Sequence, residues 1–77
     1  MGRKYEYLIM DELKFEKNMA EVVAAMVDAG YDPVAQLTGF LQTGNESFIT
    51  RKGNARSLIR TLDIVKIKEY YDKHMKP

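Results

Sequence analysis

The chain has 77 residues, of which 12 are lysine or arginine and 11 are aspartate or glutamate, so its formal net charge is +1. A chain this short forms one small domain, which buries only about 60% of the surface that its unfolded form exposes. It has no cysteine and a single histidine, His74, which excludes disulfides, cysteine-based zinc sites and an ordinary structural metal site. Self-association is the remaining supplement for so small a core, and we expect a homodimer.

The charge is distributed unevenly along the chain. Residues 1–50 carry four basic and eight acidic side chains, whereas residues 51–77 carry eight basic and three acidic ones. Two copies related by a twofold axis could bring these halves together, which also favours a homodimer. No apolar run approaches the ~20 residues of a membrane span, and the N-terminus lacks the apolar core of a signal peptide. We therefore expect a cytoplasmic protein without membrane insertion.

The first ten residues, "MGRKYEYLIM", lack helix-capping signals. We expect residues 1–10 to form a short strand or an extended arm, followed by a single helical domain at residues 11–77. Apolar residues then recur at three- and four-residue spacing, which favours a helix over a strand. These residues are Phe15, Met19, Val22, Val23 and Met26. This first helix begins near Asp11 or is capped again at Asn18, and it ends at Gly30, which tolerates a left-handed conformation.

A second helix is predicted immediately after the first. Asp32 suits an N-cap and Pro33 the first helical position, where the missing N–H costs nothing. The helix runs to about Thr43 and stops at Gly44. Its expected buried edge consists of Val34, Leu37 and Leu41, with Phe40 flanking.

Gly39 lies inside this second helix, where glycine costs roughly 1 kcal/mol relative to alanine. Close approach of another helix is our interpretation, and a ligand that approaches the backbone is the alternative. If packing requires Gly39, alanine in its place should lower stability although it improves helix propensity.

An irregular link, "NESFITRKGN", precedes the C-terminal helices, and Phe48 and Ile49 are expected to fill the core beneath it. Asn54 is predicted to cap a third helix, whose apolar face is Ala55, Leu58, Ile59 and Leu62. Asp63 can cap again, so "IVKIKEYYDKHM" is either a fourth helix or a continuation. Its apolar stripe is Ile64, Ile67 and Tyr71. The prediction is an all-α domain of three or four helices.

Catalytic function is not supported by this sequence. Catalysis needs a nucleophile with a base, or paired carboxylates in a cleft, and the lone His74 is expected to be solvated. Asp11 and Glu12 suit the N-terminal dipole of the first helix without further role. We predict no enzyme activity and no cofactor.

The tight turn between the first two helices has the outline of a helix-turn-helix, whose second helix would enter the major groove of DNA. Binding there requires cations to neutralise phosphates, yet residues 18–50 contain neither lysine nor arginine. DNA binding through the second helix is therefore disfavoured. Nucleic-acid binding through the basic residues 51–77 stays the alternative function.

Basic side chains gather at the third helix. Arg56 and Arg60 lie four residues apart and are expected to project together, and Arg51 and Lys52 could reach the same region. Arginine forks pair well with carboxylates and phosphates, so these four residues form a candidate anion-binding or partner-binding site. The alternative is a solvated face, partly neutralised by acidic residues of the same chain or a second subunit. Charge reversal at Arg56 and Arg60 is expected to distinguish a recognition site from a dimer contact.

The segment "GYDPVAQLTGFLQTGNESFITRKGNARSLIR" resembles the central segment of the IreB family of small bacterial regulatory phosphoproteins. The resemblance covers roughly residues 15–62. The motif positions that carry it include Tyr31, Pro33, Gln36, Gly39, Gly44, Asn54, Ala55 and Arg56.

The resemblance implies a non-enzymatic, helical homodimer. It also implies a role in signalling beneath a membrane-anchored Ser/Thr kinase, in the envelope-stress response of Gram-positive bacteria. Members of the family are phosphorylated on threonines of an N-terminal tail. The first serine or threonine of this chain is Thr38, so the family's phosphorylation site does not transfer. We expect a regulatory protein that acts by protein–protein interaction.

Overall fold

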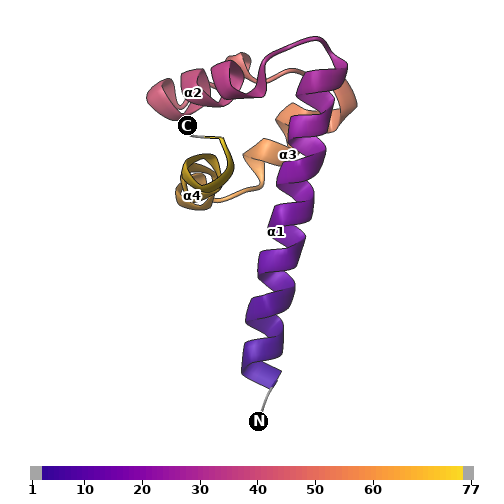
Figure 1. The fold of residues 1–77 in the computed structure, drawn as a ribbon, viewed down its shortest axis with the longest axis vertical. Coiled ribbons are helices and arrows are strands. Elements are labelled where there is room, and N and C mark those ends of the chain that lie inside the picture. Colours follow the sequence, from indigo (N-terminus) through magenta and orange to yellow (C-terminus); the bar gives the residue numbers. More distant parts are fainter. Residues whose placement is uncertain (1–2, 76–77) are drawn as a thin grey trace.

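A long helix, α1, dominates the molecule. The computed structural model describes residues 3–75, and for residues 3–9 the backbone alone. Helix α1 spans Arg3–Asp28, and its N-terminal half projects beyond the other elements (Figure 1). The overall dimensions are therefore elongated, at 45 × 24 × 21 Å.

The strand or extended arm predicted for residues 1–10 is wrong for residues 3–10, which are helical. Residues 1–2 lie outside the described residues. The helix also runs through Asp11 and Asn18 without a new start. The physical reason is that strong helix formers fill the segment, and neither glycine nor proline interrupts it before Gly30. The division into an arm and a domain stays a prediction.

The turn between α1 and α2 follows the local signals in the sequence. Gly30 adopts a left-handed φ of 84°, and the Tyr31 N–H donates to the Met26 carbonyl at 2.9 Å. Helix α2 spans Pro33–Thr43, and the Asp32 carboxylate accepts a hydrogen bond from the Val34 N–H at 3.1 Å. Gly44 ends the helix with a φ of 71°. The predicted limits of α2 are thus confirmed.

Two 3-10 turns, η1 (Glu46–Phe48) and η2 (Lys52–Asn54), form the link to α3, which spans Ala55–Arg60. Asn54 occupies the predicted N-cap position of α3, but it does not cap the helix through its side chain. Asn54 precedes the helix but has a left-handed φ of 62°, and its side chain makes no capping hydrogen bond. Asparagine tolerates this conformation, so the residue serves the turn by its backbone.

Helix α4 spans Ile64–His74 and is separate from α3, because the Asp63 carboxylate accepts a hydrogen bond from the Val65 N–H at 2.8 Å. Of the predicted apolar stripe, Ile67 is buried and Tyr71 half-buried, whereas Ile64 is exposed. The Tyr71 hydroxyl lies 2.7 Å from the Thr38 hydroxyl, which ties α4 to α2. The four-helix, all-α fold is confirmed, and residues 3–75 contain no strand.

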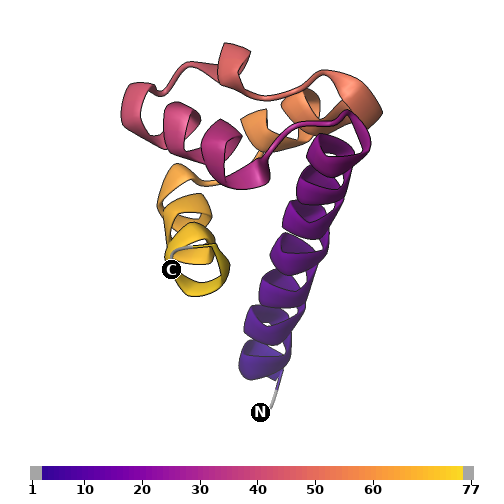
Figure 2. The ribbon, with the colours of Figure 1, turned by 45° about the horizontal axis from the view of Figure 1, so that its top comes forward.

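One apolar core joins all four helices. Helix α2, the link and α3 gather at the C-terminal end of α1, and α4 lies on the same side of α1 as α2 (Figure 2). The fully or nearly fully buried side chains are Met19, Val22, Ala25, Met26, Leu37, Phe40, Ile49, Ala55, Ile59 and Ile67. Phe40 is more buried than its predicted neighbours on α2, Val34 and Leu41, which are half-buried. None of the helices among residues 3–75 is long and apolar enough to cross a bilayer.

The link contributes one core residue where we predicted two. Ile49 is fully buried, but Phe48 is 43% exposed. The Phe48 ring instead lies against the backbone of α2 at Gly39, where an added β-carbon would lie 2.8 Å from its Cε1 and Cγ atoms. The close approach predicted at Gly39 therefore exists, but an aromatic side chain of η1 makes it, and not another α-helix.

Gly39→Ala should consequently destabilise the protein by about 1–3 kcal/mol, because the new methyl group displaces the Phe48 ring. Urea denaturation followed by circular dichroism measures this change. The same substitution in a Phe48→Ala background should be neutral or stabilising by up to about 1 kcal/mol, since only the helix-propensity gain remains. An equal loss in both backgrounds would show that Phe48 is not the obstacle.

Candidate functional site

The four basic residues of the predicted binding site lie close together on the link and α3, but they make different contacts. Arg51, Arg56 and Arg60 line one shallow hollow together with Ser57. Arg51 and Arg56 also line a second hollow of about 400 Å³, with Lys52. The structure therefore brings the four into one region, as the sequence predicted. Whether they bind a partner stays a prediction.

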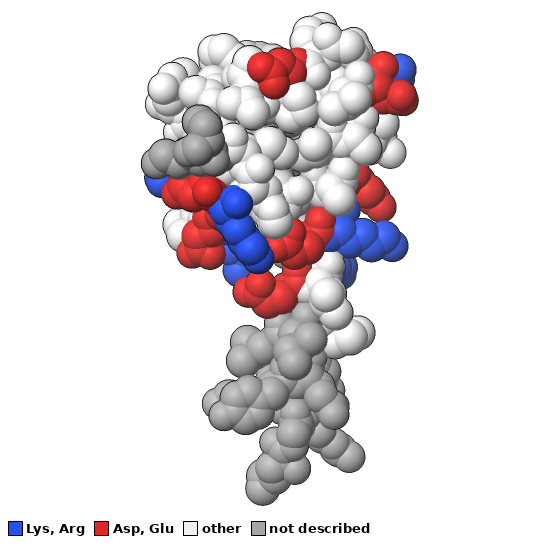
Figure 3. Space-filling view, in the orientation of Figure 1, with Lys and Arg blue, Asp and Glu red and all other residues white. Residues whose placement is uncertain are grey.

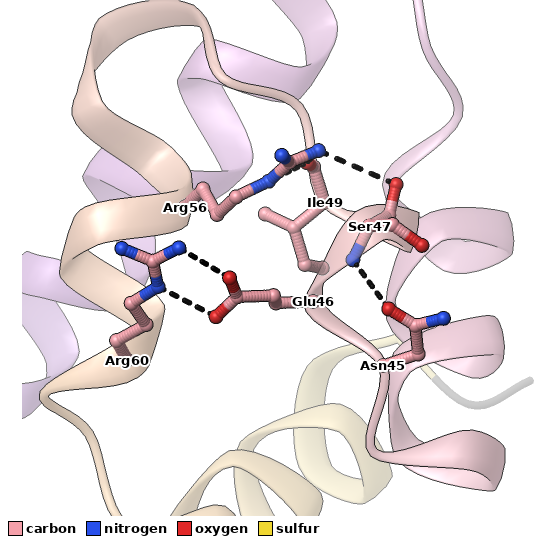
Figure 4. Close-up of polar contacts among 6 residues, drawn as sticks. All are labelled: Asn45, Glu46, Ser47, Ile49, Arg56 and Arg60. Atoms are coloured by element: carbon pink, nitrogen blue, oxygen red, sulfur yellow. Dashed lines mark hydrogen bonds and ion pairs between the residues drawn. The ribbon is translucent and has the colours of Figure 1, made fainter.

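Arg56 is an anchor for the link. Its Nε and Nη2 atoms donate to the Ile49 carbonyl at 3.1 and 3.0 Å, and Nη2 also reaches the Ser47 carbonyl at 3.5 Å (Figure 4). The Ile49 side chain is fully buried in the core. The guanidinium thus holds the link against α3, and no described residue accepts a hydrogen bond from its Nη1 atom.

Arg60 reaches a different acceptor. It makes a two-pronged ion pair with Glu46 of η1, in which Nε lies 2.6 Å from Oε2 and Nη2 contacts Oε1 (Figure 4). The hydrogen bond from Arg60 lowers the pKa of Glu46, and the same contact raises the pKa of Arg60. Arg56 and Arg60 therefore bind two separate groups of the link, although we predicted that they could act on one anion together.

Ion pairs join the acidic and basic halves of the chain within one molecule. Besides the Arg60–Glu46 pair, Lys52 lies 3.7 Å from Asp28, and Glu16 lies 3.8 Å from Lys73 and 3.6 Å from His74. Figure 3 shows acidic and basic side chains interleaved across the middle of one face, while the part over α2 is largely uncharged. The uneven charge of the sequence is thus compensated inside the fold.

The larger hollow lies between the start of α2, the link and α3. Its lining residues are Tyr31, Gln36, Ser47, Ile49, Thr50, Arg51, Lys52 and Arg56, and none of them is acidic. The Gln36 side-chain carbonyl accepts a hydrogen bond from the Thr50 N–H at 3.1 Å, which fixes the link beside α2. The Lys52 ammonium donates to the Asp28 carbonyl at 3.2 Å.

The motif positions have distinct places in this arrangement. Tyr31, Gln36 and Arg56 line the larger hollow, and the others shape the backbone around it. Pro33 begins α2, Gly44 ends it, and Gly39 leaves room for the Phe48 ring. Asn54 makes the left-handed turn before α3, and Ala55 is the buried first residue of α3.

Sequence reasoning missed Ser47 and Thr50 as lining residues and assigned no role to Gln36. Their proximity depends on how the link folds back, which no local pattern encodes. The one available signal was the concentration of motif positions on either side of the link. Among the side chains that the structure describes, those of residues 10–75, no three His, Cys, Asp or Glu are grouped closely enough to hold a metal ion.

Comparison with known proteins gives consistent results. The family model of the IreB regulatory phosphoprotein matches residues 3–73. A UPF0297 protein of Clostridioides difficile (strain 630) is 32% identical over 71 residues, which cover 92% of this chain and 84% of that protein. A UPF0297 protein of Lachnoclostridium phytofermentans is 36% identical over 66 residues, which cover 78% of this chain and 75% of that protein. The family match spans almost the whole chain, so the resemblance read from its motif is confirmed, and this chain belongs to the IreB family of small regulatory proteins.

Proposed function

We propose that this chain is a non-enzymatic, cytoplasmic regulator that acts by binding another protein, within bacterial Ser/Thr-kinase signalling of the envelope-stress response. The observation that carries the proposal is the gathering of motif residues around one acid-free hollow, beside the half-exposed ring of Tyr31. An exposed aromatic ring next to arginines is typical of protein-binding surfaces. The family description as regulatory proteins supports the same conclusion.

The alternative function, nucleic-acid binding through residues 51–77, has less support. Lys52, Arg60 and Lys73 each pair with a carboxylate of residues 1–50. A nucleic acid is bound by an uninterrupted track of cations, because every phosphate that is neutralised adds to the affinity. Acidic groups interleaved with the cations work against such a track.

Affinity capture tests the proposal. The purified chain, immobilised and exposed to an extract of its native host, should retain a defined protein, and nuclease treatment of the extract should leave that capture unchanged. The amount retained should change when the host's membrane Ser/Thr kinase is deleted. Retention of nucleic acid in place of a protein would favour the alternative function.

A homodimer is part of this proposal, and an exposed stripe of residues on α1 supports it. On the side of α1 turned away from the core, residues recur at three- and four-residue spacing, as in the seam of paired helices. They are Met10, Leu13, Lys17, Ala20, Ala24 and Val27, and all six are exposed. Only Lys17 among them is charged. A second copy of the chain, carrying the same stripe, is the partner that we propose for this face.

Leu13→Lys should therefore weaken dimerisation by about tenfold or more, because Leu13 is 62% exposed in one chain and would be buried between two. Sedimentation velocity across micromolar concentrations measures the change. Val65→Lys on α4 is the matched control, since Val65 is equally exposed, at 61%, and lies outside the stripe. A wild-type chain that sediments as an 8.9 kDa monomer would remove the dimer from the proposal.

A further inference from the structure

The larger hollow presents hydrogen-bond donors that the fold leaves unused. Among the described residues, Arg51 has no hydrogen-bond or ion-pair partner, and neither the Ser47 hydroxyl nor the Gln36 amide nitrogen makes a hydrogen bond. The Nη1 atom of Arg56 also donates to no described acceptor. These groups come from three elements that are separated in sequence and meet at one depression.

Several acceptors around the hollow already receive hydrogen bonds from the protein itself. The Ile49 and Ser47 carbonyls accept hydrogen bonds from Arg56, and the Gln36 side-chain carbonyl accepts one from the Thr50 N–H. The Thr50 hydroxyl in turn accepts a hydrogen bond from the Lys52 N–H at 3.2 Å. A ligand that supplies acceptors and negative charge therefore suits this hollow better than one that supplies donors, because the unused donors have no partner among the described residues.

We propose that this hollow binds a phosphorylated side chain of a partner protein. Arg51, Lys52 and Arg56 place three positive charges around it, without a carboxylate in its lining. A phosphate monoester carries nearly two negative charges and three acceptor oxygens at neutral pH, whereas a carboxylate has one charge and two oxygens. The phosphate matches both the charge and the number of unused donors better.

The surroundings of the hollow favour a ligand with a single phosphate over a polyanion. Asp28 lies beside Lys52, and Glu46 beside Arg60, so carboxylates flank the three cations of the hollow. A polyanion such as RNA would meet these carboxylates on either side. Tyr31, which is 53% exposed, gives the rim of the hollow an aromatic surface on which a residue next to the phosphorylated one can pack.

This inference rests on the proposed protein-binding function and names the chemical group that is recognised. Titration of the 15N-labelled chain with N-acetyl-O-phosphoserine amide, at constant ionic strength, tests it directly. The amide signals of residues 47–52 and the Nε signal of Arg56 should shift and saturate. The glutamate analogue, N-acetylglutamate amide, and inorganic phosphate serve as the other two arms. Phosphoserine amide should bind about tenfold more tightly than the glutamate analogue.

Arg51→Gln is the variant of choice, because Arg51 has no partner in the described structure and its loss should leave the fold intact. It should weaken phosphoserine binding by about tenfold. Lys68→Gln is the matched control, since Lys68 is also exposed and basic but pairs with Asp72 on α4, outside the hollow. Its binding should equal that of the wild type.

Several results would overturn the inference: no saturable shifts, equal binding of the glutamate analogue, or binding that Arg51→Gln leaves unchanged. Inorganic phosphate that binds more tightly than phosphoserine amide would assign the site to a free phosphate compound instead. Other outcomes distinguish the failure of this inference from the failure of the proposed function. A protein captured equally before and after phosphatase treatment would refute phosphate recognition and preserve protein binding. Saturable phosphoserine binding with no protein captured would preserve phosphate recognition and refute protein binding.

Discussion

Arg56→Met should lower the free energy of unfolding by about 2–3 kcal/mol, because the guanidinium makes charge-assisted hydrogen bonds that anchor the Ile49 carbonyl. Methionine retains much of the aliphatic packing of arginine, so the loss reports the hydrogen bonds. For a domain of this size the melting temperature should fall by about 4–8 °C per kcal/mol. Urea denaturation and thermal unfolding, both followed by circular dichroism, provide the measurements.

Arg60→Met is the matched control for this experiment. Arg60 lies one turn further along α3, and its ion pair with Glu46 is exposed to solvent on both sides. Exposed ion pairs contribute little to stability because water and salt screen them. We expect a clearly smaller loss than for Arg56→Met. Equal losses, or a negligible loss for Arg56→Met, would contradict the anchoring role of Arg56.

This anchoring role changes how the basic cluster should be tested. From the sequence, charge reversal at Arg56 and Arg60 is expected to separate recognition from dimerisation. In the structure Arg56 supports the link itself, so its reversal should lower stability and disturb any site nearby. Arg51, which has no partner among the described residues, is the position where a loss of binding can be assigned to the site.

Ile67→Ala should lower the free energy of unfolding by about 2–5 kcal/mol, because it removes buried methyl and methylene groups and leaves a cavity. Ile67 is fully buried, and it is the one buried residue of α4 within the described chain. The remaining anchors of α4 are peripheral, such as the Tyr71–Thr38 hydrogen bond and the edge-on contact of Tyr70 with Phe15. We therefore expect α4 to detach first.

Hydrogen exchange measured by NMR distinguishes detachment of α4 from global unfolding. In Ile67→Ala, the amides of α4 should exchange faster than those of α1 and α2. Val65→Ala is the control, because Val65 is exposed and its truncation should change stability by less than about 0.5 kcal/mol. Comparable losses in the two variants would mean that burial of Ile67 does not hold α4 in place.

The helix boundaries that depend on local chemistry could be predicted from the sequence. Gly30 and Gly44 end helices, and the carboxylates of Asp32 and Asp63 cap them, because each signal acts within a few residues. The conformation of residues 3–10 is harder to predict, because β-prone tyrosines there lie in a run of strong helix formers. Extending an existing helix costs less than starting one, so α1 continues through these tyrosines.

The sequence predicts where the candidate site lies, but not the contacts that its residues make. The spacing of Arg56 and Arg60 placed both on one helix, yet their acceptors lie on the link. The path of that link depends on Ile49 entering the core and Phe48 lying on Gly39. Both are tertiary contacts, which residue spacing does not encode. For the same reason the uneven charge suggested contact between chains, whereas the fold pairs the halves within one chain.

Site-specific photo-crosslinking in the native host tests the central claim most directly, namely that the face around the larger hollow binds a protein. Benzoylphenylalanine would replace Tyr31, on the rim of the hollow, and in a separate variant Val65, which is similarly exposed on α4. We predict a discrete crosslink to another protein from position 31, lost on adding Arg51→Gln, and none from position 65. No crosslink from position 31, or the same crosslinks from both positions, would contradict the claim.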